Sequence, residues 1–236
     1  MSFYSDFAGY YEAVFPFEEG IYSFLREHAP AGARRVLDIG CGTGEYCGAF
    51  TSDGLEAVGV DLDPEMIEVA RERYPGASFH VLDARDVAGL DGPFDMCFSI
   101  GNVVSHLEQD ALPRFLEAVG GLLGRSGVWI LQVVNWDHIL KRPAYRFPDV
   151  AVAGVVFTRE YPEVSGDRLR FVTRLSKEEA TVFEGAVWLY PLRASACLEL
   201  HAAAGFDLLG HYGSFRGTPF DPGAESSSVY VFRSRG

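Results

Sequence analysis

The strongest structural signal in the chain is the stretch VLDIGCGTGEY, residues Val36–Tyr46. It runs from a short apolar segment, Arg35–Ile39, which is typical of a buried strand, into a predicted helix over Gly44–Ser52. Between them stand three glycines, Gly40, Gly42 and Gly44. Glycines there permit a tight turn and a close approach of a ligand to the backbone, and the first N–H groups of the helix can bind a carboxylate or a phosphate. The stretch therefore predicts a ligand-binding loop between a strand and a helix.

Strands and helices alternate outward from this loop. Further strands are predicted over residues 56–60, 77–82, 94–100 and 128–134, with helices that begin near Asp63-Pro64 and Asp110. A helix over 193–204 and strands over 206–212 and 227–233 complete the pattern. Such alternation is typical of an α/β fold with a doubly wound, mostly parallel sheet that carries helices on both faces. We expect seven strands in this sheet.

Two segments depart from the alternation. Residues 141–190 contain three runs rich in Val, Phe, Thr, Tyr and Trp, over 152–161, 168–175 and 180–190, which predict an antiparallel β-meander inserted after the fifth strand. It would serve as a cap over a ligand or as a dimer face. Residues 1–30 are rich in aromatic side chains and predict a helical arm, either packed on the body or folded over a site as a flap. The main domain is then expected over 31–140 and 191–236.

The charge balance restricts the partners. Acidic residues outnumber basic residues by 33 to 20, which gives a formal net charge of −13. This disfavours binding to nucleic acid or to anionic lipid, so we expect neither as a partner. The N-terminal residues lack the pattern of a signal peptide, and the most apolar stretch, 127–134, is too short to span a bilayer. The four cysteines have no spacing typical of a zinc site or a disulfide framework, and we expect a cytoplasmic protein with reduced thiols.

Two ligand classes use a glycine loop of this kind. A dinucleotide site requires G-x-G-x-x-G to seat a pyrophosphate, whereas this chain has Glu45 where the third glycine of that pattern would stand. Asp38, at the end of the preceding strand, also disfavours a dianionic ligand and favours one with a cationic amine. A nicotinamide-dependent oxidoreductase is therefore the weaker interpretation.

With these residues the chain resembles the class I S-adenosylmethionine-dependent methyltransferases, and the resemblance extends to the order of elements over nearly the whole chain. It implies a Rossmann-like methyltransferase fold, S-adenosyl-L-methionine as cofactor and S-adenosyl-L-homocysteine as product. It places the methionine end of the cofactor over the glycine loop near Asp38, the ribose hydroxyls on Asp61 and the adenine on Asp83 and the backbone of Ala84. The full implied cofactor set is Tyr11, Asp38, Gly40, Cys41, Gly42, Gly44, Asp61, Leu62, Met66, Asp83, Ala84 and Ile100.

The methyl acceptor is less clearly marked. The segment NWDHIL, 135–140, and the pair Tyr10-Tyr11 are similar to segments of the glycine and sarcosine N-methyltransferases, which implies a small-molecule acceptor and transfer to nitrogen rather than oxygen. We predict that His106, Asn135 and Tyr190 position the acceptor. Each has an ordinary alternative: a histidine satisfied by backbone, a turn residue that ends a strand, and an aromatic residue packed on the body.

Several further expectations follow. The Asn/Asp-Pro-Pro-Tyr/Phe motif of nucleic-acid and protein-glutamine methyltransferases is absent from the fourth strand end, and Ser99 stands where metal-dependent relatives carry a carboxylate, so we expect no metal. We expect a monomer or a homodimer. A protein that binds S-adenosylmethionine without turnover remains an alternative that the sequence leaves open.

Overall fold

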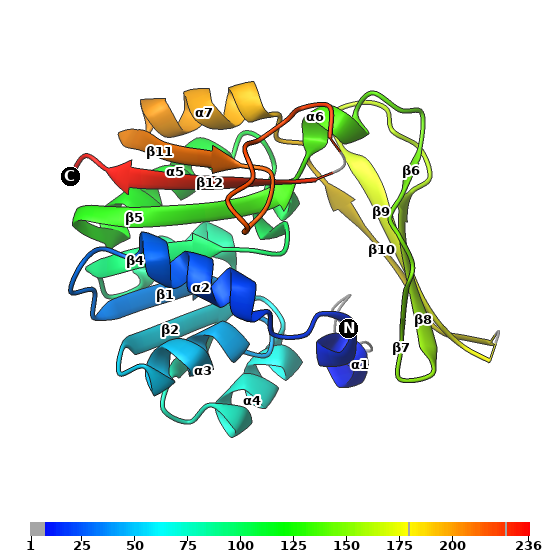
Figure 1. The fold of residues 1–236 in the computed structure, drawn as a ribbon, viewed down its shortest axis with the longest axis horizontal. Helices are drawn as coiled ribbons and strands as arrows, with labels where there is room; N and C mark the ends of the chain where they lie inside the picture. The colour runs from blue at the N-terminus through cyan, green and yellow to red at the C-terminus, as the bar shows by residue number, and fades with distance from the viewer. Residues whose placement is uncertain (1–7, 179, 225) are drawn as a thin grey trace.

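A computed structural model describes residues 8–178, 180–224 and 226–236, and the side chains of residues 8, 9 and 11 lie outside that description. Its larger part is a seven-stranded sheet in the order β11-β12-β5-β4-β1-β2-β3 (Figure 1). The strands are β1 (Arg35–Ile39), β2 (Glu56–Asp61), β3 (Ser78–Val81), β4 (Phe94–Ser99), β5 (Leu123–Val134), β11 (Phe206–Tyr212) and β12 (Ser227–Ser234). Only β12 runs against the others among these strands, because it pairs antiparallel with both β5 and β11. The expectation of a doubly wound, mostly parallel sheet is confirmed.

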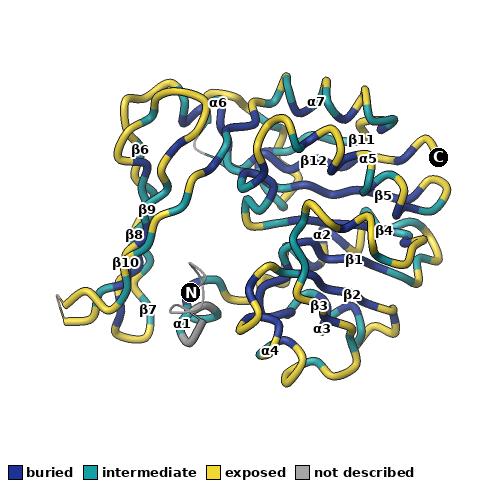
Figure 2. Tube along the Cα trace, turned by 180° about the vertical axis from the view of Figure 1, so that it is seen from behind, coloured by how far each residue is buried: buried dark blue, intermediate teal, exposed yellow. Residues whose placement is uncertain are grey.

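Helices cover both faces of this sheet. The helices of the main body are α2 (Glu19–His28), α3 (Glu45–Ser52), α4 (Pro64–Arg73), α5 (Leu112–Leu122) and α7 (Ala194–Ala203). Side chains alternate across a strand, so β1 turns Val36 to the face of α2, α3 and α4 and Leu37 to the face of α5 and α7. Each face thus has its own apolar core, and the central strands are buried along their length (Figure 2).

A second, antiparallel sheet stands beside the first one (Figure 1). Its strands are β6 (Tyr145–Arg146), β7 (Val150–Val152), β8 (Val155–Tyr161), β9 (Leu169–Lys177) and β10 (Ala180–Leu189). The order is β10-β9-β8-β6, and β7 also pairs with β8. The antiparallel insertion is as expected, but β6 and β7 were missed, because runs of two and three residues show no alternation.

Shorter elements connect these parts. The one-turn helix α6 (Trp136–Ile139) follows β5, and 3₁₀ helices cover Ala84–Gly89 and Val103–His106. Helix α1 (Ala8–Val14) approaches the antiparallel sheet, where Val14 packs against Val155, Phe157 and Leu175. Among the described residues no helix is long and apolar enough to cross a membrane.

Candidate cofactor and acceptor site

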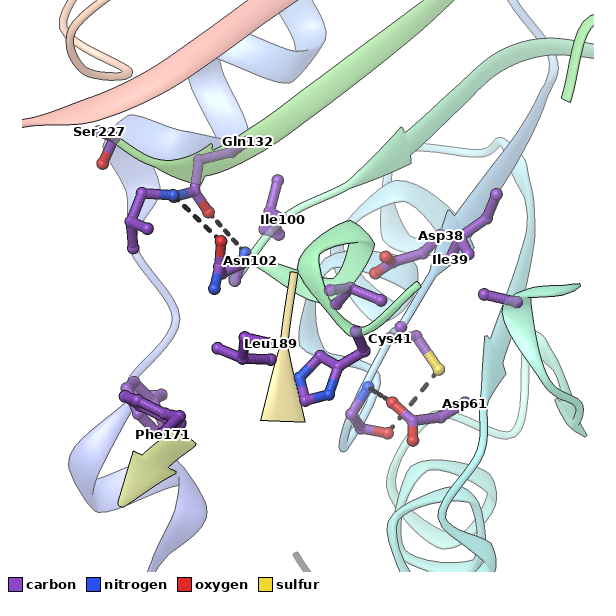
Figure 3. Close-up of a pocket in the computed structure, with 18 of the residues that line it drawn as sticks. Asp38, Ile39, Cys41, Asp61, Ile100, Asn102, Gln132, Phe171, Leu189 and Ser227 are labelled. Atoms are coloured by element: carbon purple, nitrogen blue, oxygen red, sulfur yellow. Dashed lines mark hydrogen bonds between the residues drawn. The ribbon is translucent and has the colours of Figure 1, made fainter. Parts of the chain in front are cut away.

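A large cleft opens where the carboxyl ends of the parallel strands meet the inner face of the antiparallel sheet. Its volume is about 1480 Å³. Single small-molecule sites occupy roughly 300–1,000 Å³, so this cleft has room for two ligands side by side. One wall is formed by the loops after β1 to β5, and the other by residues of β8, β9 and β10. Figure 3 shows Asp38 and Asp61 on the first wall and Phe171 on the far side of the cleft.

The glycine loop is held in a conformation that few other residues adopt. Gly40, Gly42 and Gly44 have φ values of 85°, 53° and 84°, in the left-handed region. A Cβ on Gly40 would lie 2.4 Å from Val103 Cγ2, and one on Gly44 would lie 2.7 Å from the ring of Phe79. Gly40 and Gly42 line the cleft, whereas Gly44 precedes α3 outside it. The structure thus gives Gly44 a packing role and does not bring it to the cleft.

Three carboxylates gather at this loop. Asp38 is 1% exposed, and its Oδ1 has no hydrogen-bond partner among the described residues. Asp61 accepts hydrogen bonds from the backbone N–H groups of Gly42 and Asp63, both at 2.9 Å. Burial raises the pKa of Asp38 well above its usual value, and the charges of Asp61 and Glu45 raise it further. Burial also raises the pKa values of Asp61 and Glu45.

Such a cluster is costly to ionise unless a cation offsets it. A cationic ligand in the cleft would stabilise all three carboxylates, and the orphaned Asp38 oxygen supplies an acceptor for an ammonium group. Asp61 keeps lone pairs for hydroxyl donors after its two backbone contacts, because each carboxylate oxygen accepts two hydrogen bonds. The residues present therefore fit a ligand that carries both an amine and a diol, as S-adenosylmethionine does.

Six more of the expected cofactor residues line the cleft. They are Cys41, Leu62, Met66, Asp83, Ala84 and Ile100. Leu62 is 64% exposed, so its side chain is available to cover a planar ring. Asp83 accepts from the backbone N–H of Arg85 at 2.9 Å and pairs with the Arg85 guanidinium at 2.6 Å, which lowers the pKa of the carboxyl. An adenine amino group at Asp83 would therefore share that carboxylate with Arg85.

Two cleft residues went unrecognised in the sequence. Gln132 accepts a hydrogen bond on Oε1 from the Gly101 N–H at 2.6 Å, and Asn102 accepts one on Oδ1 from the Val134 N–H at 3.1 Å (Figure 3). With their carbonyl oxygens engaged, both side chains can turn amide N–H donors toward the cleft. The signal for Gln132 was its polarity within the apolar strand 128–134.

The structure places two of the three expected acceptor residues at the cleft. His106 and Tyr190 line the cleft. Burial lowers the pKa of His106 to about 4, so the imidazole is neutral near pH 7. The Tyr190 hydroxyl donates to Glu108 at 3.0 Å, and its backbone N–H donates to the Ser105 carbonyl at 2.7 Å. Both residues are therefore placed to contact a ligand.

Asn135 does not line the cleft. Its Oδ1 accepts from the His138 N–H at 3.2 Å, so it caps α6. Its Nδ2 donates to the carbonyls of Asp221 and Ala224, both at 2.9 Å. The amide is fully engaged in ending the strand and holding the loop before β12, so the structure favours the alternative role. The Tyr11 side chain and residues 1–7 lie outside the described part of the chain. The hypothesis that residues 1–12 form a flap therefore stays a prediction.

Comparison with known proteins agrees with this geometry. A family model described as "Methyltransferase domain" matches residues 36–127. The glycine/sarcosine N-methyltransferase of Halorhodospira halochloris is 28% identical over 203 residues, which cover 83% of this chain and 74% of that protein. The rabbit (Oryctolagus cuniculus) glycine N-methyltransferase is 29% identical over 135 residues, 49% of this chain and 45% of that protein. The chain spans about half the length, or less, of the first curated relatives it matches.

A solved structure supports the fold over the full length. The crystal structure of an S-adenosylmethionine-dependent methyltransferase from Clostridium acetobutylicum superposes with a TM-score of 0.84 at 15% identity, covering 99% of each chain. Fold and site define a class I methyltransferase architecture with a second sheet over its cleft. The matched domain family and the relatives support a class I S-adenosylmethionine-dependent methyltransferase, as the sequence predicted, and the solved structure shows the same fold.

Proposed function

We propose that this protein transfers a methyl group from S-adenosylmethionine to a nitrogen of a small-molecule acceptor. The observation that carries the proposal is the set of three carboxylates at the left-handed glycine loop, of which Asp38 is buried and has no hydrogen-bond partner for its Oδ1 among the described residues. A site of this charge favours a ligand that brings positive charge, and S-adenosylmethionine carries both an ammonium and a sulfonium. When bound, it supplies an electrophilic methyl group on a positively charged sulfur.

Asp38 and Asp61 would hold the cofactor. Asp38 accepts a hydrogen bond from the ammonium group, and Asp61 accepts from the ribose hydroxyls while it keeps Gly42 in place. Leu62 and Met66 cover the adenine faces, and Ala84 offers a backbone N–H to the ring. The N–H groups of Asn102 and Gln132 orient ligand oxygens near the ends of β4 and β5.

The rest of the chemistry is alignment and exclusion of water, because a neutral amine attacks a sulfonium methyl without covalent help from the protein. His106, neutral near pH 7, can accept a hydrogen bond from an N–H of the attacking amine and so orient the amine lone pair toward the methyl group. Tyr190 positions the acceptor from the antiparallel side. An amine is favoured over a hydroxyl because relatives are named as N-methyltransferases.

Two partner classes are excluded by this proposal. With a net charge of −13 the protein, as a monomer or homodimer in the cytoplasm, would bind neither nucleic acid nor membrane. Retention on heparin that weakens with added salt would contradict this part of the proposal.

The test is a release assay for S-adenosylhomocysteine across a panel of small amines, phenols and carboxylates, with binding measured in parallel by calorimetry. We expect micromolar binding of the cofactor, no binding of NAD, and turnover with amines. Turnover only with phenols would refute the choice of nitrogen. Cofactor binding without release on any member would favour a non-catalytic binding protein, and failure to bind the cofactor would refute the proposal entirely.

A further inference from the structure

The antiparallel wall of the cleft contains an arginine in an unusual setting. Arg159, on β8, is half-buried and lines the cleft, and no carboxylate of the described residues lies within ion-pair distance of it. A guanidinium has five N–H donors, yet the structure gives Arg159 one hydrogen bond, from Nη2 to the Pro148 carbonyl at 3.3 Å. Its Nε is buried and has no hydrogen-bond partner in the part of the chain that the structure describes.

Aromatic rings surround this guanidinium in place of an acid. Its carbon lies 5.8, 5.2 and 5.7 Å from the ring centres of Phe15, Phe147 and Phe157. Burial lowers the pKa of Arg159, which is the expected effect of a charge held away from water. Asp149, whose charge acts on Arg159 from a distance, is paired with Arg146 at 2.9 Å. The charge of Arg159 is therefore half-buried without an ion pair among the described residues.

A second orphaned polar group lies directly across from it. Thr173 on β9 is the register partner of Arg159, so the two side chains share the inner face of the sheet. Thr173 also lines the cleft, is 2% exposed, and its Oγ1 has no hydrogen-bond partner among the described residues. Arg159 Nε and Thr173 Oγ1 thus have no acceptor among the described residues and belong to the same wall of one cleft, an arrangement that suits an anionic ligand group.

The wall beside them is aromatic. Phe147 lies 5.7 Å from Tyr161, and Tyr161 lies 5.3 Å from Phe171, between ring centres, and all three residues line the cleft. These rings are tilted by 59° and 41° to one another and form an aromatic wall for a ligand body. The other arginines of the cleft do not fit the role, because Arg85 pairs with Asp83 and Arg216 is exposed.

The two walls of the cleft thus carry opposite charges. Three carboxylates lie on the loop wall, and Arg159 lies with Thr173 on the antiparallel wall. We propose that the acceptor is an amine with an aromatic body and an anionic group, such as a carboxylate, which Arg159 and Thr173 bind. This inference rests on the proposed function, because only a methyltransferase needs a methyl acceptor. The anion site itself is tested by binding alone. It excludes glycine as the preferred acceptor, because glycine has no body to cover the ring surface.

The experiment compares two probes of the same shape, one with an anionic group and one with a neutral group, and adds glycine as a third. Protein saturated with S-adenosylhomocysteine is titrated calorimetrically with 4-(aminomethyl)benzoate, with its neutral analogue 4-(aminomethyl)benzamide, and with glycine. We expect the benzoate to bind about tenfold or more tightly than the amide, the range for a charge-assisted hydrogen bond, and more tightly than glycine. Equal affinity for benzoate and amide, or tighter binding of glycine, would overturn the inference.

Variants locate the effect. Arg159→Gln should remove the preference for the benzoate, whereas Arg174→Gln, which removes the same charge from the opposite face of β9, should keep it. Thr173→Val should weaken benzoate binding several-fold without lowering the Tm, because it removes a buried hydroxyl that has no partner. A preference that survives in both Arg159→Gln and Thr173→Val would refute the site, and Thr173→Val decides alone if Arg159→Gln does not fold.

These outcomes separate the two proposals. Failure to bind S-adenosylhomocysteine refutes the proposed function, and the probe comparison is then made on the protein without it. Normal cofactor binding and amine turnover with no preference for the benzoate refutes the anion site alone.

Discussion

Replacement of Gly40 by alanine tests how closely the glycine loop packs against the segment after β4. The new Cβ would lie 2.4 and 2.8 Å from the two methyl carbons of Val103, well inside contact distance. The residue also has φ +85°, where an alanine costs roughly 1–2 kcal/mol of backbone strain. Overpacking adds about 1–3 kcal/mol, so we expect a loss of about 2–5 kcal/mol in the free energy of unfolding.

Two controls divide this loss into its parts. Gly54 has the same φ of +85° but nothing within 4 Å of a Cβ, so Gly54→Ala measures the backbone strain alone. Val103→Ala removes both clashing methyl groups, so the double variant with Gly40→Ala should be less destabilised than the two single changes together, by about 1–3 kcal/mol. The assay is urea unfolding followed by tryptophan fluorescence. Strict additivity, or a Gly40→Ala loss no larger than that of Gly54→Ala, would refute the packing argument.

Four further predictions concern the cleft. The pKa values of Asp38 and Asp61 are raised in the free protein, and a bound cation lowers them, so the affinity for S-adenosylmethionine should fall as the pH falls through those raised values. Calorimetry from about pH 8 down to about pH 5 should show this loss, and S-adenosylhomocysteine, which lacks the sulfonium charge, should show less of it. The pKa of Asp38 is higher in the folded protein than in the unfolded chain. The unliganded protein should therefore lose stability as the pH rises through the Asp38 pKa of the folded state, and a Tm that does not change with pH would contradict this. Asp61→Ala should weaken cofactor binding by about 1–3 kcal/mol, and unchanged calorimetric affinity would remove Asp61 from the ribose site. If His106 assists the amine, the part of the kcat/KM profile that depends on His106 should titrate near its pKa of about 4, so a limb at the ordinary histidine value of 6.5 that His106→Gln abolishes would show the burial effect to be wrong.

The backbone of the main sheet was largely predictable because its signals are local. The run Arg35–Ile39 has the bounds of β1, and the run 206–212 has those of β11. The acidic residues at the ends of β1 and β2 were predicted to meet because parallel strands end at one edge of a sheet. Asp38 and Asp61 do meet there.

What escaped prediction depends on contacts distant in sequence. In the sequence Asn135 is a polar residue at the end of a predicted strand, as Asp38 is. Its partners Asp221 and Ala224 are 86 and 89 residues away, so nothing near it in the chain reveals that it holds a loop. The pairing of Arg159 with Thr173 depends on the register of β8 against β9, and no pattern in either strand fixes that register.

The insertion of β6 to β10 has a consequence for how such a protein can diversify. The chain leaves the main sheet after β5 and returns at α7, and the strands of the second sheet pair only with one another among the described residues. Sequence change in residues 141–190 can therefore alter the wall that faces the acceptor without breaking a hydrogen bond between strands of the main sheet. The face of β1 and β2 that packs on α2, α3 and α4 has a core that contains no residue of the second sheet. The wall proposed to bind the acceptor and the loops proposed to bind S-adenosylmethionine can thus evolve, or be engineered, almost independently in one chain.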